Sequence, residues 1–117
     1  MSIRLDGEVA IITAGGGAIG GAQSRVFAES GAAVVVTDLD LQKAMTVVDD
    51  IRATGGHAIG CVHDVRDASG WALVVAAAEG AFGPVTTLVN NAGANVRVAF
   101  DDQTEEMWDL IVGTILT

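Results

Sequence analysis

The sequence predicts one α/β domain over residues 1–117, built on a parallel sheet with helices on both faces. Half of the residues are hydrophobic, which is enough for a packed core. Short runs rich in β-branched residues alternate with segments whose apolar residues recur at helical spacing. Because strands that alternate with helices through short connections form right-handed crossovers, the strands should run parallel.

Four apolar runs predict strands at residues 9–13, 33–37, 57–62 and 87–89. A helix is expected after each strand, and glycines at 31, 55 and 83 are expected to end the first three. Asp40 is a plausible cap for the second helix and Thr104 for the fourth. The predicted buried stripes are Ile19, Ala22, Val26 and Phe27; then Leu41, Ala44, Met45, Val48 and Ile51; then Trp71, Val74, Val75, Ala78 and Phe82.

Composition and charge exclude several classes of function. The net charge is −9, with only six Lys and Arg residues, so binding to nucleic acid or to an anionic membrane is not expected. We see no signal peptide and no apolar run long enough to span a bilayer. The single Cys61 cannot form an internal disulfide and is expected to be a small buried strand residue. These features predict a cytoplasmic protein.

A glycine-rich loop, Thr13 to Gly20, lies between the first predicted strand and helix, and Gly15-x-Gly17-x-x-Gly20 fits the dinucleotide-binding pattern. Glycines let backbone N–H groups approach a pyrophosphate, and the helix N-terminus adds free donors and a partial positive charge. The alternative is a flexible turn without a ligand. In its strand-to-helix context the loop predicts a Rossmann-type, doubly wound sheet with strand order 3-2-1-4.

An acidic residue, Asp38, follows the second predicted strand, 21 residues after Gly17. A carboxylate at this point accepts hydrogen bonds from the adenosine ribose hydroxyls. It would repel a 2′-phosphate, and no Arg or Lys follows at once, so NAD is predicted over NADP. The alternative is that Asp38 is only a turn residue or helix cap.

Four segments together resemble the short-chain dehydrogenase/reductase family over essentially the full chain. Thr13 to Gly20 is similar to the family's T-G-x-x-x-G-I-G loop, and Asp64-Val65 resembles its adenine-contacting pair. Asn90-Asn91-Ala92-Gly93 matches its N-N-A-G segment, and residues 104–109 resemble the start of its fourth helix.

The resemblance implies an NAD-dependent oxidoreductase that transfers hydride between nicotinamide and an alcohol or carbonyl substrate. Asn90 is expected to be structural and Asn91 the cofactor neighbour. The residues expected to contact the cofactor are Gly15, Gly16, Gly17, Ile19, Gly20, Asp38, Leu39, Asp64, Val65, Asn91, Ala92 and Gly93.

The sequence departs from the family pattern at several points. Ala14 and Ala18 replace two loop glycines, and Ile115 stands where the family's fourth helix carries a catalytic-site Asn. The chain has no Tyr, which the resemblance makes the general acid/base together with a Lys and an upstream Ser. We therefore assign no catalytic residue, expect a chain truncated before the later strands, and predict that it is inactive alone. Lys43, His57 and His63 are interpreted as ordinary surface and strand-end residues, and no metal ligand set is expected.

Two other functions remain open at this point. One is a non-catalytic dinucleotide-binding module or truncated remnant. The other is a methyltransferase with S-adenosylmethionine, which also uses a glycine-rich loop and an acid after the second strand, although residues 90–93 argue against it. The uncovered edge of the fourth strand and the apolar last helix predict a homo-oligomer or association with a missing C-terminal half.

Overall fold

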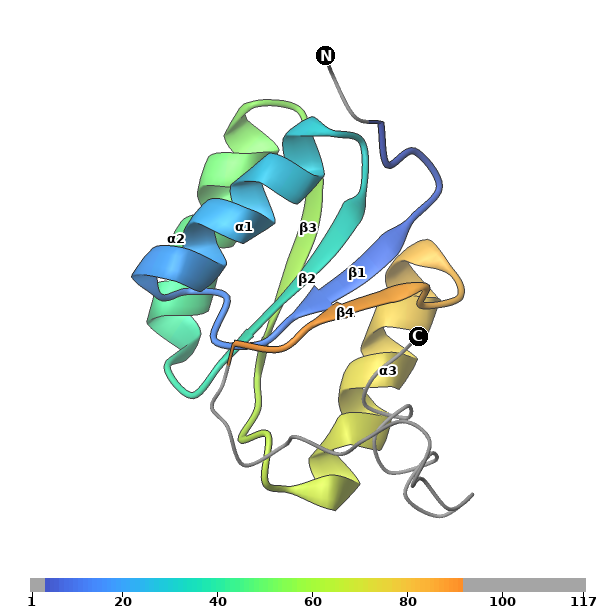
Figure 1. The fold of residues 1–117 in the computed structure, drawn as a ribbon. Helices are drawn as coiled ribbons and strands as arrows, with labels where there is room; N and C mark the ends of the chain where they lie inside the picture. Colours follow the sequence, from blue (N-terminus) through green and yellow to red (C-terminus); the bar gives the residue numbers. More distant parts are fainter. Residues whose placement is uncertain (1–3, 92–117) are drawn as a thin grey trace.

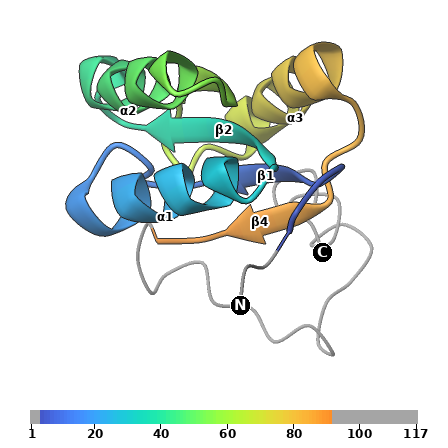
Figure 2. The same ribbon diagram turned by 90° about the horizontal axis from the view of Figure 1, so that it is seen from above.

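The computed structural model describes residues 4–91 of the chain. Strands and helices alternate as β1 (Val9–Ile12), α1 (Ala18–Glu29), β2 (Ala33–Asp38), α2 (Leu41–Ala53), β3 (His57–Val62), α3 (Ala68–Phe82) and β4 (Thr87–Val89). All strand pairs are parallel, in the order β3-β2-β1-β4. Figure 2 shows β2, β1 and β4 side by side in that order. The predicted fold class and strand order are confirmed, while the predicted fourth helix lies outside the described residues.

The sheet is covered on both faces, by α1 and α2 on one and by α3 on the other (Figure 1). Successive side chains of a strand point to opposite faces. In β2, Val34 and Val36 therefore pack toward α1 and α2, whereas Val35 packs toward Trp71 and Val74 of α3. Because the side chains of residues 33–36 face the two cores in turn, this part of β2 is a continuous apolar run rather than an alternating one.

Helix α1 packs through its small residues, and this corrects the predicted stripe. Its buried residues are Gly20, Gly21 and Ser24, whereas the side chains of Ile19 and Val26 are 71% and 57% exposed. The helix lies too close to its neighbours for larger groups: a Cβ on Gly21 would lie 3.3 Å from a methyl group of Val47. Small residues therefore mark the buried face here.

The predicted cap of α2 and the predicted ends of α2 and α3 are confirmed. The Asp40 carboxylate accepts hydrogen bonds from the backbone N–H of Gln42 and Lys43, which caps α2. Gly55 and Gly83 follow α2 and α3 with φ of +88° and +103°, a left-handed conformation that glycine adopts without a steric penalty. The buried stripe of α2 differs from the predicted one. Val47 is buried although it was not in the predicted stripe, whereas Leu41 was in it and is half exposed.

Candidate cofactor site

The glycine-rich loop is tied to the end of β2 by two hydrogen bonds. The backbone N–H of Gly15 donates to the Thr37 carbonyl at 2.8 Å, and that of Gly16 donates to the Asp38 carboxylate at 3.1 Å. A Cβ on Gly15 would lie 2.8 Å from the Ile12 carbonyl oxygen, and one on Gly16 would lie 2.6 Å from the Lys43 backbone. These two glycines are therefore required by packing inside the protein, before any ligand is considered.

The two alanines of the loop differ in conformation. Ala14 has a φ of +50°, so it occupies the left-handed region that the family pattern fills with glycine. Ala18 is the first residue of α1 and carries no such strain. Of the two replacements, only Ala14 imposes a backbone cost, roughly 1–2 kcal/mol for an L-residue.

The N-terminus of α1 differs from those of the other described helices. The side chains of Asp40 and Asp67 cap α2 and α3, whereas Gly17, at the same position before α1, has no side chain to do so. The first N–H groups of a helix lack partners within the helix and carry a partial positive charge. The loop and α1 therefore present donors where an anionic group could bind.

The Asp38 carboxylate lies beside this helix end. Its Oδ2 accepts the Gly16 N–H and its Oδ1 accepts the Asp40 N–H at 3.0 Å. A carboxylate offers about four lone-pair positions, so capacity remains for further donors such as ribose hydroxyls. Asp38 therefore does act as a turn residue, the alternative considered from the sequence. That role does not use all of its acceptor positions.

Asp64 follows the end of β3 and forms a bidentate ion pair with Arg66. Arg66 Nη2 lies 2.9 Å from Asp64 Oδ2, its Nε lies 3.1 Å from Oδ1, and its backbone N–H also donates to Oδ1. These hydrogen bonds, chiefly those of the guanidinium, lower the pKa of Asp64 to about 2. The carboxylate is therefore ionised at neutral pH, and only part of its acceptor capacity is left for an incoming amino group.

A cavity of about 400 Å³ brings Leu39 and Asp64 together with the base of α3. His63, which also lines it, was expected to be an ordinary strand-end residue, yet it is 5% exposed and its Nε2 has no hydrogen-bond partner among the described residues. Burial lowers the pKa of His63. No sequence pattern indicated that the His63 imidazole would be buried. The Asp67 cap, two residues before Ser69, is different, because Asp is a residue type that commonly caps helices.

The first two residues of the N-N-A-G segment are held by Thr13 at the end of β1. The Thr13 hydroxyl donates to Asn90 Oδ1 at 2.9 Å and accepts the Asn91 backbone N–H at 2.8 Å. The Asn91 amide donates to the Thr13 carbonyl and to Gln23 Oε1, at 3.2 and 2.6 Å. Both Asn residues thus join β4 to β1, and Gln23 is a partner that the sequence did not indicate. Ala92 and Gly93 lie outside the described residues, as do residues 101–109 and Ile115.

The remaining predicted site residues lie at the same edge of the sheet. Ile19 and Leu39 are 71% and 69% exposed, so both apolar side chains are open to a ligand. Val65 is partly buried against α3.

Two residues that were not expected in the site lie nearby. Lys43 is exposed on α2, as predicted for a surface residue, whereas Cys61 was predicted to be buried and is only half-buried on β3. Burial raises the pKa of the Cys61 thiol, which keeps it protonated at neutral pH.

The described part of the chain has neither a metal-binding cluster nor a membrane-spanning helix. Between residues 4 and 91, no three His, Cys, Asp or Glu side chains gather as a metal site would require. No helix in that range is long and apolar enough to cross a membrane.

The fold and the loop define a Rossmann-type α/β domain, and comparison with known proteins gives its family. A family model described as short chain dehydrogenase matches residues 8–117. The chain therefore belongs to the short-chain dehydrogenase/reductase family, which removes the methyltransferase alternative.

Individual relatives agree with this family. The chain is 46% identical to a 2,5-dichloro-2,5-cyclohexadiene-1,4-diol dehydrogenase of Sphingobium indicum, over 96% of the chain and 45% of that protein. It is 42% identical to an NADP-dependent (R)-specific alcohol dehydrogenase of Lentilactobacillus kefiri, over 92% of the chain and 42% of that protein. The crystal structure of hydroxysteroid dehydrogenase from Escherichia coli matches with a TM-score of 0.74 and 40% identity, over 86% of the chain and 43% of that structure. The chain thus spans less than half the length of these relatives.

Proposed function

We propose that this chain is the NAD(H)-binding portion of an oxidoreductase of this family. In the whole protein, hydride would pass between the nicotinamide and an alcohol or carbonyl substrate. The observation that carries the proposal is the Asp38 carboxylate, 3.1 Å from the Gly16 N–H and beside the uncapped N-terminus of α1. A pyrophosphate at the helix end and a ribose at the carboxylate would both find complementary groups there.

The choice of NAD over NADP rests on the charge of Asp38. A 2′-phosphate on the ribose would meet this carboxylate at close range, and like charges repel. Family membership does not decide the matter, since one of the relatives is named as NADP-dependent. The preference is therefore a property of this residue and needs its own test.

The test compares Asp38→Asn with Asp38→Ala by calorimetry, using NAD and NADP with each variant. Asn keeps one acceptor oxygen for the Gly16 N–H and gives up the hydrogen bond from the Asp40 N–H, so Asp38→Asn should leave the loop in place and remove the repulsion. We expect it to weaken NAD about tenfold, because hydrogen bonds to charged groups contribute about 1.5–3 kcal/mol. NADP should bind as well as before or better. Asp38→Ala should weaken both cofactors, because the loop also loses its anchor.

Asp40→Asn is the matched control, since it removes an equal charge two residues away, keeps a side chain that can cap α2, and should leave the ratio of NAD to NADP affinity unchanged. The proposal fails if the unmodified chain binds NADP more tightly than NAD, or if Asp38→Asn leaves that ratio as it was.

The catalytic part of the proposal concerns the whole protein. The resemblance assigns the proton transfer to a Tyr, and none occurs in these 117 residues. We propose that the chain alone binds the cofactor without turning it over, and that oxidoreductase activity requires the Tyr and its Lys partner from outside this sequence.

A further inference from the structure

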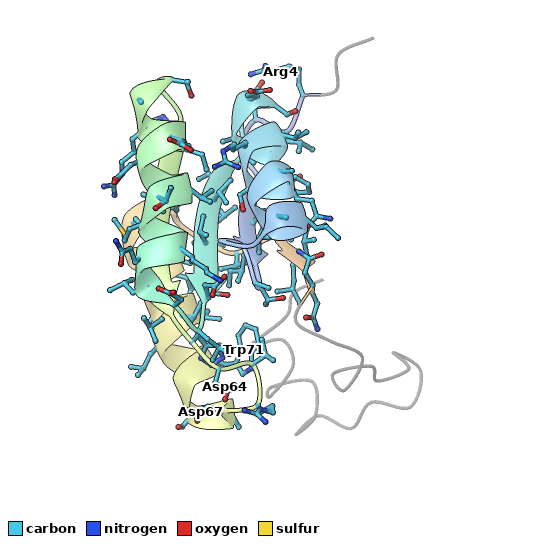
Figure 3. All side chains as sticks on the ribbon, turned by 90° about the vertical axis from the view of Figure 1, so that its left-hand side faces the viewer. Arg4, Asp64, Asp67 and Trp71 are labelled. Carbon is cyan, nitrogen blue, oxygen red and sulfur yellow. The ribbon has the colours of Figure 1, made fainter. Side chains whose placement is uncertain are left out.

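A single buried side chain, Trp71, contacts the chain on both sides of Asp64. Trp71 lies in the first turns of α3 and is only 3% exposed. Its indole Nε1 donates a hydrogen bond to the Val65 carbonyl at 2.9 Å. Its ring meets the His63 imidazole edge to face, with 4.3 Å between centroids and 66° between planes. Figure 3 shows Trp71, Asp64 and Asp67 gathered at one end of the molecule.

The segment that Trp71 contacts has left the sheet. β3 ends at Val62, and the His63 N–H still donates to the Asp38 carbonyl at 3.0 Å. Beyond His63, the Asp64 carbonyl accepts from the Asp67 N–H as the chain turns into α3. The partly buried Val65 has its carbonyl bonded to the indole, and a buried carbonyl without a partner is costly. The indole N–H therefore fixes where the backbone at Val65 lies.

The packing around this contact leaves little room for movement. A Cβ on Gly70 would lie 2.6 Å from His63 Nδ1, so the start of α3 sits directly on the imidazole. Asp67 holds the same helix start by accepting hydrogen bonds from the N–H groups of Ser69 and Gly70. Since His63 is held from one side and Val65 from the other, the Asp64 backbone between them has a defined position.

We propose that Trp71 is a positioning residue for the adenine end of the cofactor. This role requires no contact between Trp71 and the cofactor. It acts by holding Asp64 and Val65 where their polar groups meet the adenine edge. The inference rests on the proposed function, because these two residues have an adenine role only if the chain binds a dinucleotide.

The test uses Trp71→Phe, which keeps a ring against His63 and removes the indole N–H. Two ligands separate the ends of the site: AMP reports on the adenine end, and inorganic pyrophosphate reports on the glycine loop alone. We expect the Kd for AMP to rise about three- to tenfold, the range for loss of one hydrogen bond, with no change for pyrophosphate. Phe82→Leu is the matched control, because it shortens an aromatic residue of α3 that packs on the same core at the far end of the helix. It should change neither Kd.

A second measurement leaves Trp71 itself unchanged. In the unmodified chain labelled with ¹⁵N, the indole N–H signal of Trp71 should shift on addition of AMP and stay in place with pyrophosphate. Trp108→Phe assigns the signal, since the chain has two Trp residues. The positioning role is overturned if AMP binds and the Trp71 signal does not move. It is also overturned if Trp71→Phe weakens AMP and pyrophosphate equally. If the unmodified chain binds neither AMP nor NAD, the proposed function itself fails, and the role of Trp71 falls with it.

Discussion

The two alanines of the glycine-rich loop should respond in opposite directions when each is replaced by glycine. Ala14 has a φ of +50° and is held there, because the Gly17 N–H donates to its carbonyl at 3.1 Å and Gly20 packs against the same carbonyl. Ala18 is the first residue of α1 and is exposed. Ala14→Gly relieves strain, whereas Ala18→Gly has no strain to relieve.

The expected magnitudes follow from this conformational difference. The left-handed conformation costs an L-residue about 1–2 kcal/mol, which glycine avoids. Glycine also raises the conformational entropy of the unfolded chain, and this offsets about 0.4–1 kcal/mol of the gain in stability. Ala14→Gly should therefore raise the free energy of unfolding by about 1 kcal/mol, or Tm by about 4–8 °C for a domain near 100 residues. Ala18→Gly should lower that free energy by up to about 0.5–1 kcal/mol, the cost of glycine in a helix.

Urea denaturation followed by circular dichroism measures both changes in parallel. A lower stability for Ala14→Gly would refute the reasoning, because it would mean that the methyl group contributes more than the backbone strain costs. An equal gain from both variants would refute it as well, since the structure strains only one of the two residues.

Three further predictions concern the loop, the buried imidazole and the sheet edge. Gly20→Ala should prevent the loop from forming and should abolish NAD binding, since a Cβ would overlap the Ala14 carbonyl oxygen; a variant with unchanged stability and Kd would contradict this. Burial lowers the pKa of His63 in the folded protein. The unfolded chain therefore binds a proton there more readily than the folded protein, and the free energy of unfolding should fall as the pH drops below about 6.5. His63→Gln should lose most of this dependence in denaturation at pH 5, 6 and 7, and an unaltered pH profile would count against it. The outer edge of β4 has no strand partner in residues 4–91, so the chain should self-associate at micromolar concentration; a well-folded, strictly monomeric species in sedimentation would disprove that.

The strands could be predicted from the sequence because burial on both faces leaves a direct signal. β2, β3 and β4 begin where their apolar runs begin, and β1 is one residue shorter than predicted. The face of α1 could not be predicted by the same reasoning, which looks for large apolar residues at helical spacing. In α1 the close approach of loop and helix selects Gly20, Gly21 and Ser24 for burial, and Ile19 is left exposed.

The candidate site was predictable where spacing along the chain determines position. Asp38 and the loop glycines follow strands whose ends meet at one edge of a parallel sheet, so their proximity could be expected. The contacts of Trp71 with His63 and Val65 could not be predicted, because they depend on how α3 docks on the sheet. The ion pair between Arg66 and Asp64 joins residues that are close in sequence. It could not be predicted either, because the residue types alone do not distinguish a paired Arg from an unpaired surface Arg.

A titration of the ¹⁵N-labelled chain with NAD, followed residue by residue in the amide spectrum, tests directly whether the carboxyl edge of the sheet binds a dinucleotide. We expect saturable shifts at Gly16, Asp38 and Asp64, at the carboxyl edge of the sheet. Gly55 and His57 line a separate cavity of about 440 Å³ together with Arg4, which Figure 3 shows at the opposite end of the molecule, and their signals should stay still. A spectrum that NAD leaves unchanged, or shifts confined to Gly55 and His57, would contradict the claim that this edge is a dinucleotide site.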